Sequence, residues 1–365
     1  MSETKTKLVF AIHSLCPGGQ ERVVSVLLNE FSNYQNVELH LLLFGKSPQL
    51  FYQIPIQTTV HKPKFRFRDN LRWWYTLKTM WYIRKTLISL NANAILSFGE
   101  LWNNFVLLSC MGCKLPIYVS DRNQPTKNIG FLQENLRKLL YPKAKGIIAQ
   151  TQFAKHVIFE KTKHCNIAVI GNPIPACNES ENITRENLVL SVGRLIDTKH
   201  HDALIKLFVK TRKADWKLVI VGDDAIKQRN KAKLEQLVND LNAQNYIELA
   251  GKSNEVHKYY QRAKIFAFTS SSEGFPNVIG EAMMAALPVV AFDCVAGPAE
   301  MVIDNENGFL VPLFDYDGFE NKLNLLIDND MLINKMSKNA LNSIQRFNAQ
   351  SISKKFFNFV LNQNN

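Results

Sequence analysis

The stretch Ser270–Pro288, which reads SSSEGFPNVIGEAMMAALP, contains the pattern that decides the fold. The apolar run Ile265–Thr269 before it predicts a strand, and the run Pro288–Phe292 at its end predicts another. Pro276 suits the first turn of a helix between these two strands. A strand, a helix and a strand in this order predict a parallel βαβ unit.

Two carboxylates make this turn a candidate binding site. Glu273 lies in the loop and Glu281 on the helix, so the two side chains could flank one ligand from different sides. Gly274 permits a close backbone approach, and the first turn of a helix offers free N–H groups to an anion. The alternative for each carboxylate is a solvated surface position, which fits poorly beside the apolar sequence AMMAALPVVAF.

Strand-like and helix-like runs alternate along the rest of the chain, which predicts α/β architecture with parallel sheets. Two doubly wound units of about 170 residues each fit this alternation. The segment Val169–Pro175, with one glycine and two prolines, precedes a polar stretch and predicts an interdomain linker. We therefore expect domains at 1–172 and 173–345, and a terminal helical segment at 346–365. The other predicted strands are Leu8–Ile12, Val37–Phe44, Ala94–Phe98, Ile117–Ser120, Gly146–Ala149, Leu188–Val192, Lys217–Val221 and Tyr246–Leu249, and the predicted helices include Glu21–Phe31, Leu132–Leu140, Asp202–Lys210, Lys231–Leu241 and Ile352–Leu361.

Composition excludes several classes of protein. The 365 residues are 46% hydrophobic and 21% charged, which is unlike a disordered chain. No apolar run approaches the roughly 18 residues of a membrane-spanning helix, and the N-terminus lacks a signal-peptide pattern. We expect a soluble cytoplasmic protein with a basic surface, since the net charge is +12.

The six cysteines are too widely spread for a disulfide framework. Cys110-Met-Gly-Cys113 is formally a CxxC motif, but it lacks a second pair or nearby histidines. Buried thiols are therefore the preferred interpretation over a redox or metal site.

Two further loops join a strand to a helix and carry glycines or cations. Gly18 and Gly19 follow the first predicted strand, without the GxGxxG or GKS/T pattern of the common nucleotide-binding loops. Gly193, Arg194 and Lys199 follow the strand that opens the second unit, where two cations are placed to bind a diphosphate. The alternatives are a simple tight turn for the first loop and solvated charges for the second.

Taken together, these motifs resemble the family 4 retaining glycosyltransferases, in the bacterial branch that acts on lipid-linked glycans and surface polysaccharides. The resemblance covers essentially the whole chain. It is carried by Gly18-Gly19-Gln-Glu21-Arg22-Val, Gly193-Arg194-Leu195 with Lys199, Glu273-Gly-Phe-Pro-Asn with Glu281-Ala-Met, and Pro288-Val-Val-Ala. It implies the GT-B fold, in which an acceptor-side and a nucleotide-sugar-binding Rossmann-like domain face each other across a cleft and the terminal helix crosses back to the first.

The resemblance also implies roles for individual residues. Arg194 and Lys199 would neutralise the diphosphate of the donor, and Glu281 would hold the ribose hydroxyls. The donor sugar and phosphate would be contacted by Glu273 and by the backbone of Gly274, Phe275, Pro276 and Asn277. Gly193 would belong to the donor loop, and Gly18 and Gly19 would lie near the transferred sugar. Asp121 and Arg122 would lie on the acceptor side. Three positions depart from the family pattern: Gln20 replaces a usual Ala, and His200 and Ala286 each replace a common Gly.

The implied activity is retaining transfer of a hexose or N-acetylhexosamine from a nucleotide sugar, with UDP preferred, to a polyprenyl-diphosphate-linked or oligosaccharide acceptor. No cofactor or metal is expected, because Asp315-Tyr316-Asp317 matches the DxD metal pattern but sits where a helix cap is favoured. The alternatives are a GDP-mannose-dependent mannosyltransferase, a sugar-phosphate epimerase, which would not explain the two motif pairs, and a basic nucleic-acid-binding protein. The positive charge permits the last of these but does not require it.

The segment His61–Leu90 holds eight basic residues and one acid, a net charge of +7. Cations interleaved with tryptophans suit an anionic membrane surface. We therefore expect peripheral binding at the inner face of the cytoplasmic membrane, while the alternative is that much of the segment packs on the first domain. The residues predicted to touch the membrane are Arg66, Arg68, Arg72, Trp73, Trp74 and Trp81.

Overall fold

The chain divides into two compact units, which are described separately. Unit 1 comprises Met1–Pro173 with Ala349–Asn365, and unit 2 comprises Ile174–Asn348. The computed structural model describes residues 5–16, 18–46, 50–176, 184–211, 213–225 and 228–361. The expected domain boundary after residue 172 lies one residue from this division, and part of the predicted linker region falls outside the described residues.

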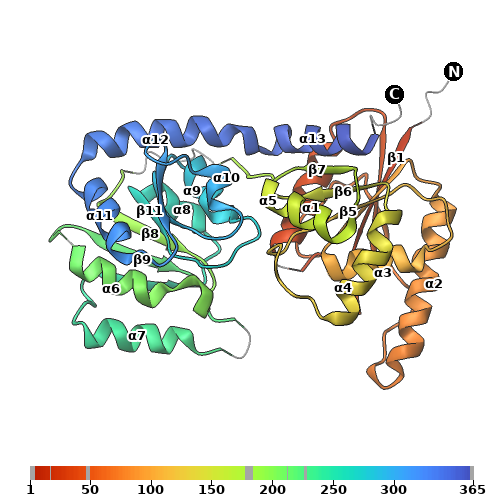
Figure 1. Cartoon of the computed structure of the whole chain (residues 1–365), viewed down its shortest axis with the longest axis horizontal. Helices are drawn as coiled ribbons and strands as arrows, with labels where there is room; N and C mark the ends of the chain where they lie inside the picture. The colour runs from red at the N-terminus through yellow and green to blue at the C-terminus, as the bar shows by residue number, and fades with distance from the viewer. Residues whose placement is uncertain are drawn as a thin grey trace. The chain divides into compact units, whose positions relative to one another are not determined.

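Unit 1 is a seven-stranded parallel sheet with helices packed on it (Figure 1). The strands lie in the order β3 (Thr59–His61), β2 (Val37–Leu43), β1 (Thr6–Ile12), β4 (Ala94–Phe98), β5 (Ile117–Ser120), β6 (Gly146–Ala149) and β7 (Ile167–Val169). The helices are α1 (Gly19–Phe31), α2 (Arg72–Leu90), α3 (Glu100–Ser109), α4 (Phe131–Leu140), α5 (Gln152–Thr162) and α13 (Ala349–Leu361). All five residues of β4 are buried, as expected for a parallel strand covered on both faces.

Unit 2 is a six-stranded parallel sheet of the same type. Its strands lie in the order β10 (Ile247–Gly251), β9 (Lys217–Val221), β8 (Leu188–Val192), β11 (Ile265–Phe268), β12 (Val289–Asp293) and β13 (Gly308–Pro312). The helices are α6 (His201–Thr211), α7 (Asn230–Asp240), α8 (Val256–Arg262), α9 (Asn277–Met284), α10 (Pro298–Met301), α11 (Tyr316–Ile327) and α12 (Asp330–Ile344). Short 3-10 turns occur in the two units at Asp69–Leu71, Tyr141–Lys143, Asp197–Lys199 and Gln345–Phe347.

The two sheets confirm the predicted α/β class and the two Rossmann-like units. Each sheet reverses its strand order once, between β1 and β4 in unit 1 and between β8 and β11 in unit 2. In open parallel sheets, ligands bind outside the carboxyl ends of the strands at such a switch point. The loops that follow these four strands therefore position the candidate site.

The terminal helix packs on unit 1. In α13, the Phe357 ring stacks on Tyr34 with 4.5 Å between centroids, and Phe359 lies edge-on against Tyr118 at 5.5 Å. Aromatic pairs of this geometry add to the energy of apolar burial. They explain why a segment that follows unit 2 in the chain belongs to the first unit.

No helix among the described residues is both long enough and apolar enough to span a membrane.

Candidate functional site

The two switch-point loops of unit 2 are hydrogen-bonded to each other. Thr269 Oγ1 donates to the Lys199 carbonyl at 2.8 Å, and Ser270 Oγ donates to the Thr198 carbonyl at 3.1 Å. The backbone N–H of Ser271 also donates to the Thr198 carbonyl, at 2.8 Å. The serine-rich start of the SSSEGFPN loop therefore fixes that loop against the loop that carries Arg194 and Lys199, a function that no local sequence pattern indicated.

This contact brings Lys199 to Glu273. The Lys199 ammonium donates to Glu273 Oε1 at 2.6 Å, and the two side chains are only 14% and 16% exposed. The ammonium also lies 4.9 Å from the centre of the Phe268 ring. Gly193 makes room for this side chain, because a Cβ at that position would lie 3.3 Å from Lys199 Cε. Two residues 74 positions apart thus form one charged pair at the switch point.

Arg194 lies in the same loop but is exposed. The loop backbone around it is held by bonds from Gly193 N to the Val221 carbonyl and from Leu195 N to the Asp223 carbonyl, each 2.9 Å long. A Cβ on Gly222 would come within 1.8 Å of the Gly193 carbonyl oxygen, so this close approach requires glycine. The structure therefore presents Arg194 to solvent on a well-fixed backbone.

Glu281 lies on α9, the helix that follows the loop of Glu273. Tyr260 of α8 donates its hydroxyl to Glu281 Oε2 at 3.1 Å. Helix α9 begins at Asn277, with Pro276 as its N-cap residue rather than inside the first turn. Tyr260 is a site residue that the sequence analysis missed, since nothing in the local sequence links it to a residue 21 positions later.

Burial keeps two neighbouring titratable groups neutral. Burial, with a smaller contribution from the Glu273 charge, raises the pKa of Cys294 to about 12, so its thiol stays protonated and unreactive near neutral pH. Burial, assisted by the positive charge of Lys199, lowers the pKa of His201 to about 4. The thiol of Cys294 and the imidazole of His201 therefore add no charge at neutral pH to Arg194, Lys199 and Glu273.

The corresponding turn of unit 1 is built around Gly18, the N-cap residue of α1. Its backbone N–H donates to the Tyr52 hydroxyl at 3.1 Å, and a Cβ there would lie 2.2 Å from Glu21 Oε2. Glu21 is buried and accepts from Gln20 Nε2 at 3.0 Å, with His13 Nε2 at 3.8 Å. Gly19 is the first residue of the helix, and Pro17 lies outside the described residues.

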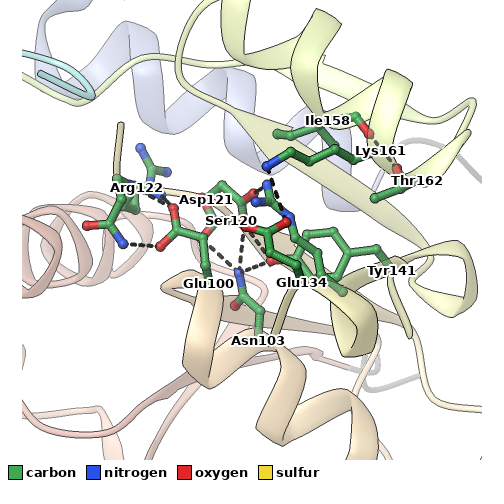
Figure 2. Close-up of polar contacts among 12 residues, drawn as sticks. Glu100, Asn103, Ser120, Asp121, Arg122, Glu134, Tyr141, Ile158, Lys161 and Thr162 are labelled. Carbon is green, nitrogen blue, oxygen red and sulfur yellow. Dashed lines mark hydrogen bonds and ion pairs between the residues drawn. The ribbon is translucent and has the colours of Figure 1, made fainter. Parts of the chain in front are cut away.

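Asp121 lies inside unit 1, not on its surface. Its carboxylate is ion-paired with Arg137 of α4, and it accepts from the Tyr141 hydroxyl at 2.6 Å and from Asn103 Nδ2 at 3.2 Å. Figure 2 shows Asn103 and Tyr141 converging on this carboxylate. Burial, then the Asp121 charge, raises the pKa of Tyr141, so the phenol remains a donor. This placement favours a structural role, and an acceptor-side role for Asp121 stays a prediction.

Arg122 packs its guanidinium between two aromatic rings, at 5.6 Å from Phe98 and 5.3 Å from Phe356 of α13. It donates to Asn172 Oδ1 at 2.6 Å, and burial lowers its pKa to about 9. The backbone N–H of Arg122 donates to Glu100 at 2.8 Å. Arg122 therefore fastens the terminal helix to unit 1, and its predicted contact with an acceptor stays a prediction.

Comparison with known proteins connects unit 2 with a family. Residues 176–343 match the family model of glycosyl transferases group 1. The amylovoran biosynthesis glycosyltransferase AmsD of Erwinia amylovora is 28% identical over 353 residues, which cover 94% of this chain and 96% of that protein. Unit 2 thus matches the group 1 glycosyl transferases, and the chain has the GT-B fold.

Two further proteins are similar over nearly their whole length. One is the N-acetylgalactosamine-N,N'-diacetylbacillosaminyl-diphospho-undecaprenol 4-alpha-N-acetylgalactosaminyltransferase of Campylobacter jejuni, 26% identical over 97% of this chain and 99% of its own. The other is a solved structure, the lipopolysaccharide outer core galactosyltransferase WaaB. It superposes with a TM-score of 0.79 at 19% identity, over 98% of this chain and 100% of that chain.

In unit 1, α2 turns its tryptophans outward. Trp73, Trp74 and Trp81 are 67%, 53% and 61% exposed, whereas Ile83 and Leu87 are buried against unit 1. Figure 1 shows α2 at the edge of the unit. The alternative that the segment packs on the first domain therefore holds for one side of the helix only.

In the segment before α2, half-buried apolar residues alternate with exposed cations. Pro63, Phe65 and Phe67 are half-buried, and the rings of Phe65 and Phe67 lie 6.0 and 5.6 Å from Tyr75. The intervening cations, Lys62, Lys64, Arg66 and Arg68, are exposed, as is Arg72. Within the described parts of the chain, none of these five cations forms an ion pair with an acid.

The cysteines and the Asp315-Tyr316-Asp317 motif form no disulfide or metal site among the described residues. The cysteines at 16, 110, 113, 165 and 294 form no disulfide, and Cys177 lies outside the described residues. Cys110 is buried, which raises its pKa to about 12. Asp315 caps α11 by accepting from Gly318 N at 2.9 Å, which confirms the predicted cap. In the described ranges, no three His, Cys, Asp or Glu side chains are grouped as metal ligands.

Proposed function

We propose that the protein is a retaining glycosyltransferase that moves a hexose or N-acetylhexosamine from a nucleotide sugar, preferably UDP-linked, to a polyprenyl-diphosphate-linked glycan. The observation that carries the proposal is the joining of the two unit 2 switch-point loops, which brings Lys199 to Glu273 on the loop that also presents the exposed Arg194. The diphospho-undecaprenol in the name of the Campylobacter jejuni relative supports the choice of acceptor.

In this proposal the two cations of the first loop bind the donor diphosphate. Arg194 is exposed and can form two parallel bonds to phosphate oxygens, and Lys199 adds a point charge whose position Glu273 fixes. Both cations stabilise negative charge as it develops on the leaving diphosphate, and such preorganised stabilisation is the largest contribution to many enzymatic rate enhancements.

Retention follows if the acceptor attacks on the face from which the diphosphate leaves. The bond between the anomeric carbon and the phosphate oxygen breaks, and the acceptor oxygen bonds to the same carbon. The proton of the acceptor hydroxyl passes to the departing phosphate oxygen. No protein nucleophile is needed, and the contribution of the enzyme is positioning and electrostatic stabilisation.

Glu281 and Glu273 have different roles in this scheme. Glu281, which accepts from Tyr260, would accept the ribose hydroxyls, and Glu273 would face the transferred sugar. Glu281→Gln should therefore weaken binding of UDP and of the UDP-sugar equally, whereas Glu273→Gln should weaken mainly the UDP-sugar. Calorimetric titration with both ligands measures this, and equal effects of Glu273→Gln on the two would contradict the division.

Activity itself is tested with a panel of UDP-sugars and GDP-mannose, a lipid diphosphate acceptor, and NMR of the product. We expect transfer from a UDP-sugar, an α-linked product from an α-linked donor, and unchanged rates with EDTA. A product of inverted configuration would contradict the retaining mechanism. Preferred transfer from GDP-mannose would contradict the choice of UDP.

The outward side of α2 and the cations before it are proposed to bind the cytoplasmic face of an anionic membrane. Tryptophans partition to the membrane interface, and each cation near an anionic surface is worth about 1 kcal/mol. Replacing Trp73 and Trp81 by Ala, or Arg66 and Arg68 by Gln, should reduce co-sedimentation with anionic vesicles at low salt. Met331→Ala, at an even more exposed apolar position in unit 2, is the control. Wild-type protein that ignores such vesicles at low salt would overturn this part of the proposal.

A further inference from the structure

An aromatic cavity lies at the carboxyl edge of the unit 1 sheet. Its volume is about 190 Å³. Four rings line it, those of Phe44 after β2, Phe67 before α2, and Trp102 and Phe105 on α3. Phe67, Trp102 and Phe105 are only half-buried. The cavity therefore offers an apolar wall to a ligand that is no larger than a short branched hydrocarbon segment.

The inner side of α2 closes the cavity without adding free hydroxyl groups. Thr76 and Thr79 line it, but their hydroxyls donate to the carbonyls of Arg72 and Tyr75 in their own helix, at 2.8 and 2.7 Å. Ligand pockets are mostly apolar with a few placed polar groups. Here the polar groups are two cations.

Lys46 and Arg72 are those cations. The Lys46 ammonium lies 4.8 Å from the centre of the Phe67 ring and is ion-paired with Asp69. Both partners of that pair are more than half exposed, so the pair is weak and Lys46 can exchange Asp69 for another anion. Arg72 is exposed and has no acidic partner among the residues that the structure describes. Aromatic walls beside two available cations match an amphiphile with a hydrocarbon part and a phosphate head.

The cavity adjoins the switch point of unit 1. Trp102 stacks on His13 at the end of β1, with 4.8 Å between ring centroids and 15° between planes. His13 in turn lies 3.8 Å from Glu21 in the first turn of α1, the turn that Gly18 caps. In a doubly wound sheet this edge is where a ligand binds. A molecule in the cavity would thus lie near the glycine turn that is predicted to lie near the transferred sugar.

We infer that this cavity binds the first isoprene unit of a polyprenyl diphosphate acceptor, with Lys46 and Arg72 on its phosphates. The inference rests on the proposed function, since it assigns the lipid end of the acceptor to a place in unit 1. This binding site is distinct from the outer side of α2 that is proposed to bind the membrane. The cavity is lined by Thr76 and Thr79 and not by the exposed tryptophans.

The test is calorimetric titration of the full chain with farnesyl diphosphate below its micelle concentration, without vesicles. Thr76→Phe, which fills the cavity, and Arg72→Gln, which removes a phosphate contact, should each weaken binding at least tenfold. Arg229→Gln removes the same charge from an exposed arginine of unit 2 that does not line the cavity, and should change binding less than twofold. Inorganic diphosphate and farnesol should each bind more weakly than farnesyl diphosphate, because each lacks one half of the ligand.

Thermal unfolding of each variant checks that it is folded, and Phe105→Ala supplies a second cavity variant should Thr76→Phe not fold. Folded cavity variants that bind farnesyl diphosphate as tightly as wild type would overturn the inference, as would wild type that does not bind it. A UDP titration of the same samples separates the two proposals. UDP binding without farnesyl diphosphate binding contradicts only the cavity assignment, whereas the reverse result supports the cavity and contradicts the donor site.

Discussion

The carboxyl edges of the two sheets both carry acids and cations, but they bury them to different extents. In unit 1 the Asp121–Arg137 pair is 6% and 4% exposed, and Tyr141 and Asn103 bond to the same carboxylate. In unit 2 the Lys199–Glu273 pair is 14% and 16% exposed, and it lies in the same joined loops as the exposed Arg194.

This difference separates structural charges from charges available to a ligand. A buried pair that also holds neutral hydrogen-bond donors contributes mainly to the fold, because removing one partner leaves the other charge without compensation. A partly exposed pair in the same loops as an exposed guanidinium can bind an anion with little rearrangement. Similar residue types at similar strand ends thus serve different purposes, and burial distinguishes them.

The largest expected effect is on the stability of unit 1. Asp121→Ala leaves the buried Arg137 unpaired and should lower the free energy of unfolding by about 3–5 kcal/mol. Asp328→Ala, which removes an exposed partner of Lys213, should cost about 0–1 kcal/mol. Denaturant unfolding measures both. A loss as small at Asp121 as at Asp328 would contradict the structural role.

The next effect is a dependence of stability on pH. His201 has a folded-state pKa of about 4 against an ordinary value of 6.5, because it is buried. Between these two pKa values the unfolded chain binds a proton at His201 and the folded chain does not. The free energy of unfolding therefore decreases as the pH falls from about 6.5 to about 4. Over this whole pH range, protonation of His201 should lower the free energy of unfolding by on the order of 3 kcal/mol.

Replacing His201 by Gln should flatten this part of the stability–pH curve, while the same change at the exposed His156 should not. Thermal unfolding across this pH range measures the slope. A slope that is the same in wild type and His201→Gln would show that another group is responsible.

The smallest effect concerns a departure from the family pattern. Ala286 and His200 stand where the family commonly has glycine, and both adopt left-handed backbone, with φ of 54° and 49°. Glycine adopts this conformation without the steric cost that a side chain incurs. Ala286→Gly should therefore raise the free energy of unfolding by about 0.5–1 kcal/mol. A decrease in the melting temperature would refute this explanation of the family glycine.

Sequence patterns predicted the long buried strands well, because continuous apolar runs bounded by turns have few other interpretations. Strands β4, β5, β6, β8 and β9 match their predicted bounds to the residue. The strands β3, β7 and β13 were missed. All three lie at a sheet edge, and β3 and β7 have only three residues each, too few for a periodicity to develop.

The candidate site was predictable only where residue types cluster in one turn, as around Glu273. The bonds that position it join residues about 70 positions apart, as between Thr269 and Lys199, and local spacing contains no information about them. The same limit applied to Asp121, for which the sequence indicated no buried partner. Its partners Arg137 and Tyr141 lie a helix away in the chain.

The most direct test of the central claim, that the joined loops of unit 2 bind the diphosphate of a nucleotide sugar, is kcat/KM of Arg194→Ala. Loss of a charge-assisted contact to an anion is worth about 1.5–3 kcal/mol, so we predict a loss of roughly ten- to a hundredfold or more with an unchanged melting temperature. Arg229→Ala, which removes another exposed arginine of unit 2, should retain full activity. A folded Arg194→Ala protein with wild-type kcat/KM would contradict the claim.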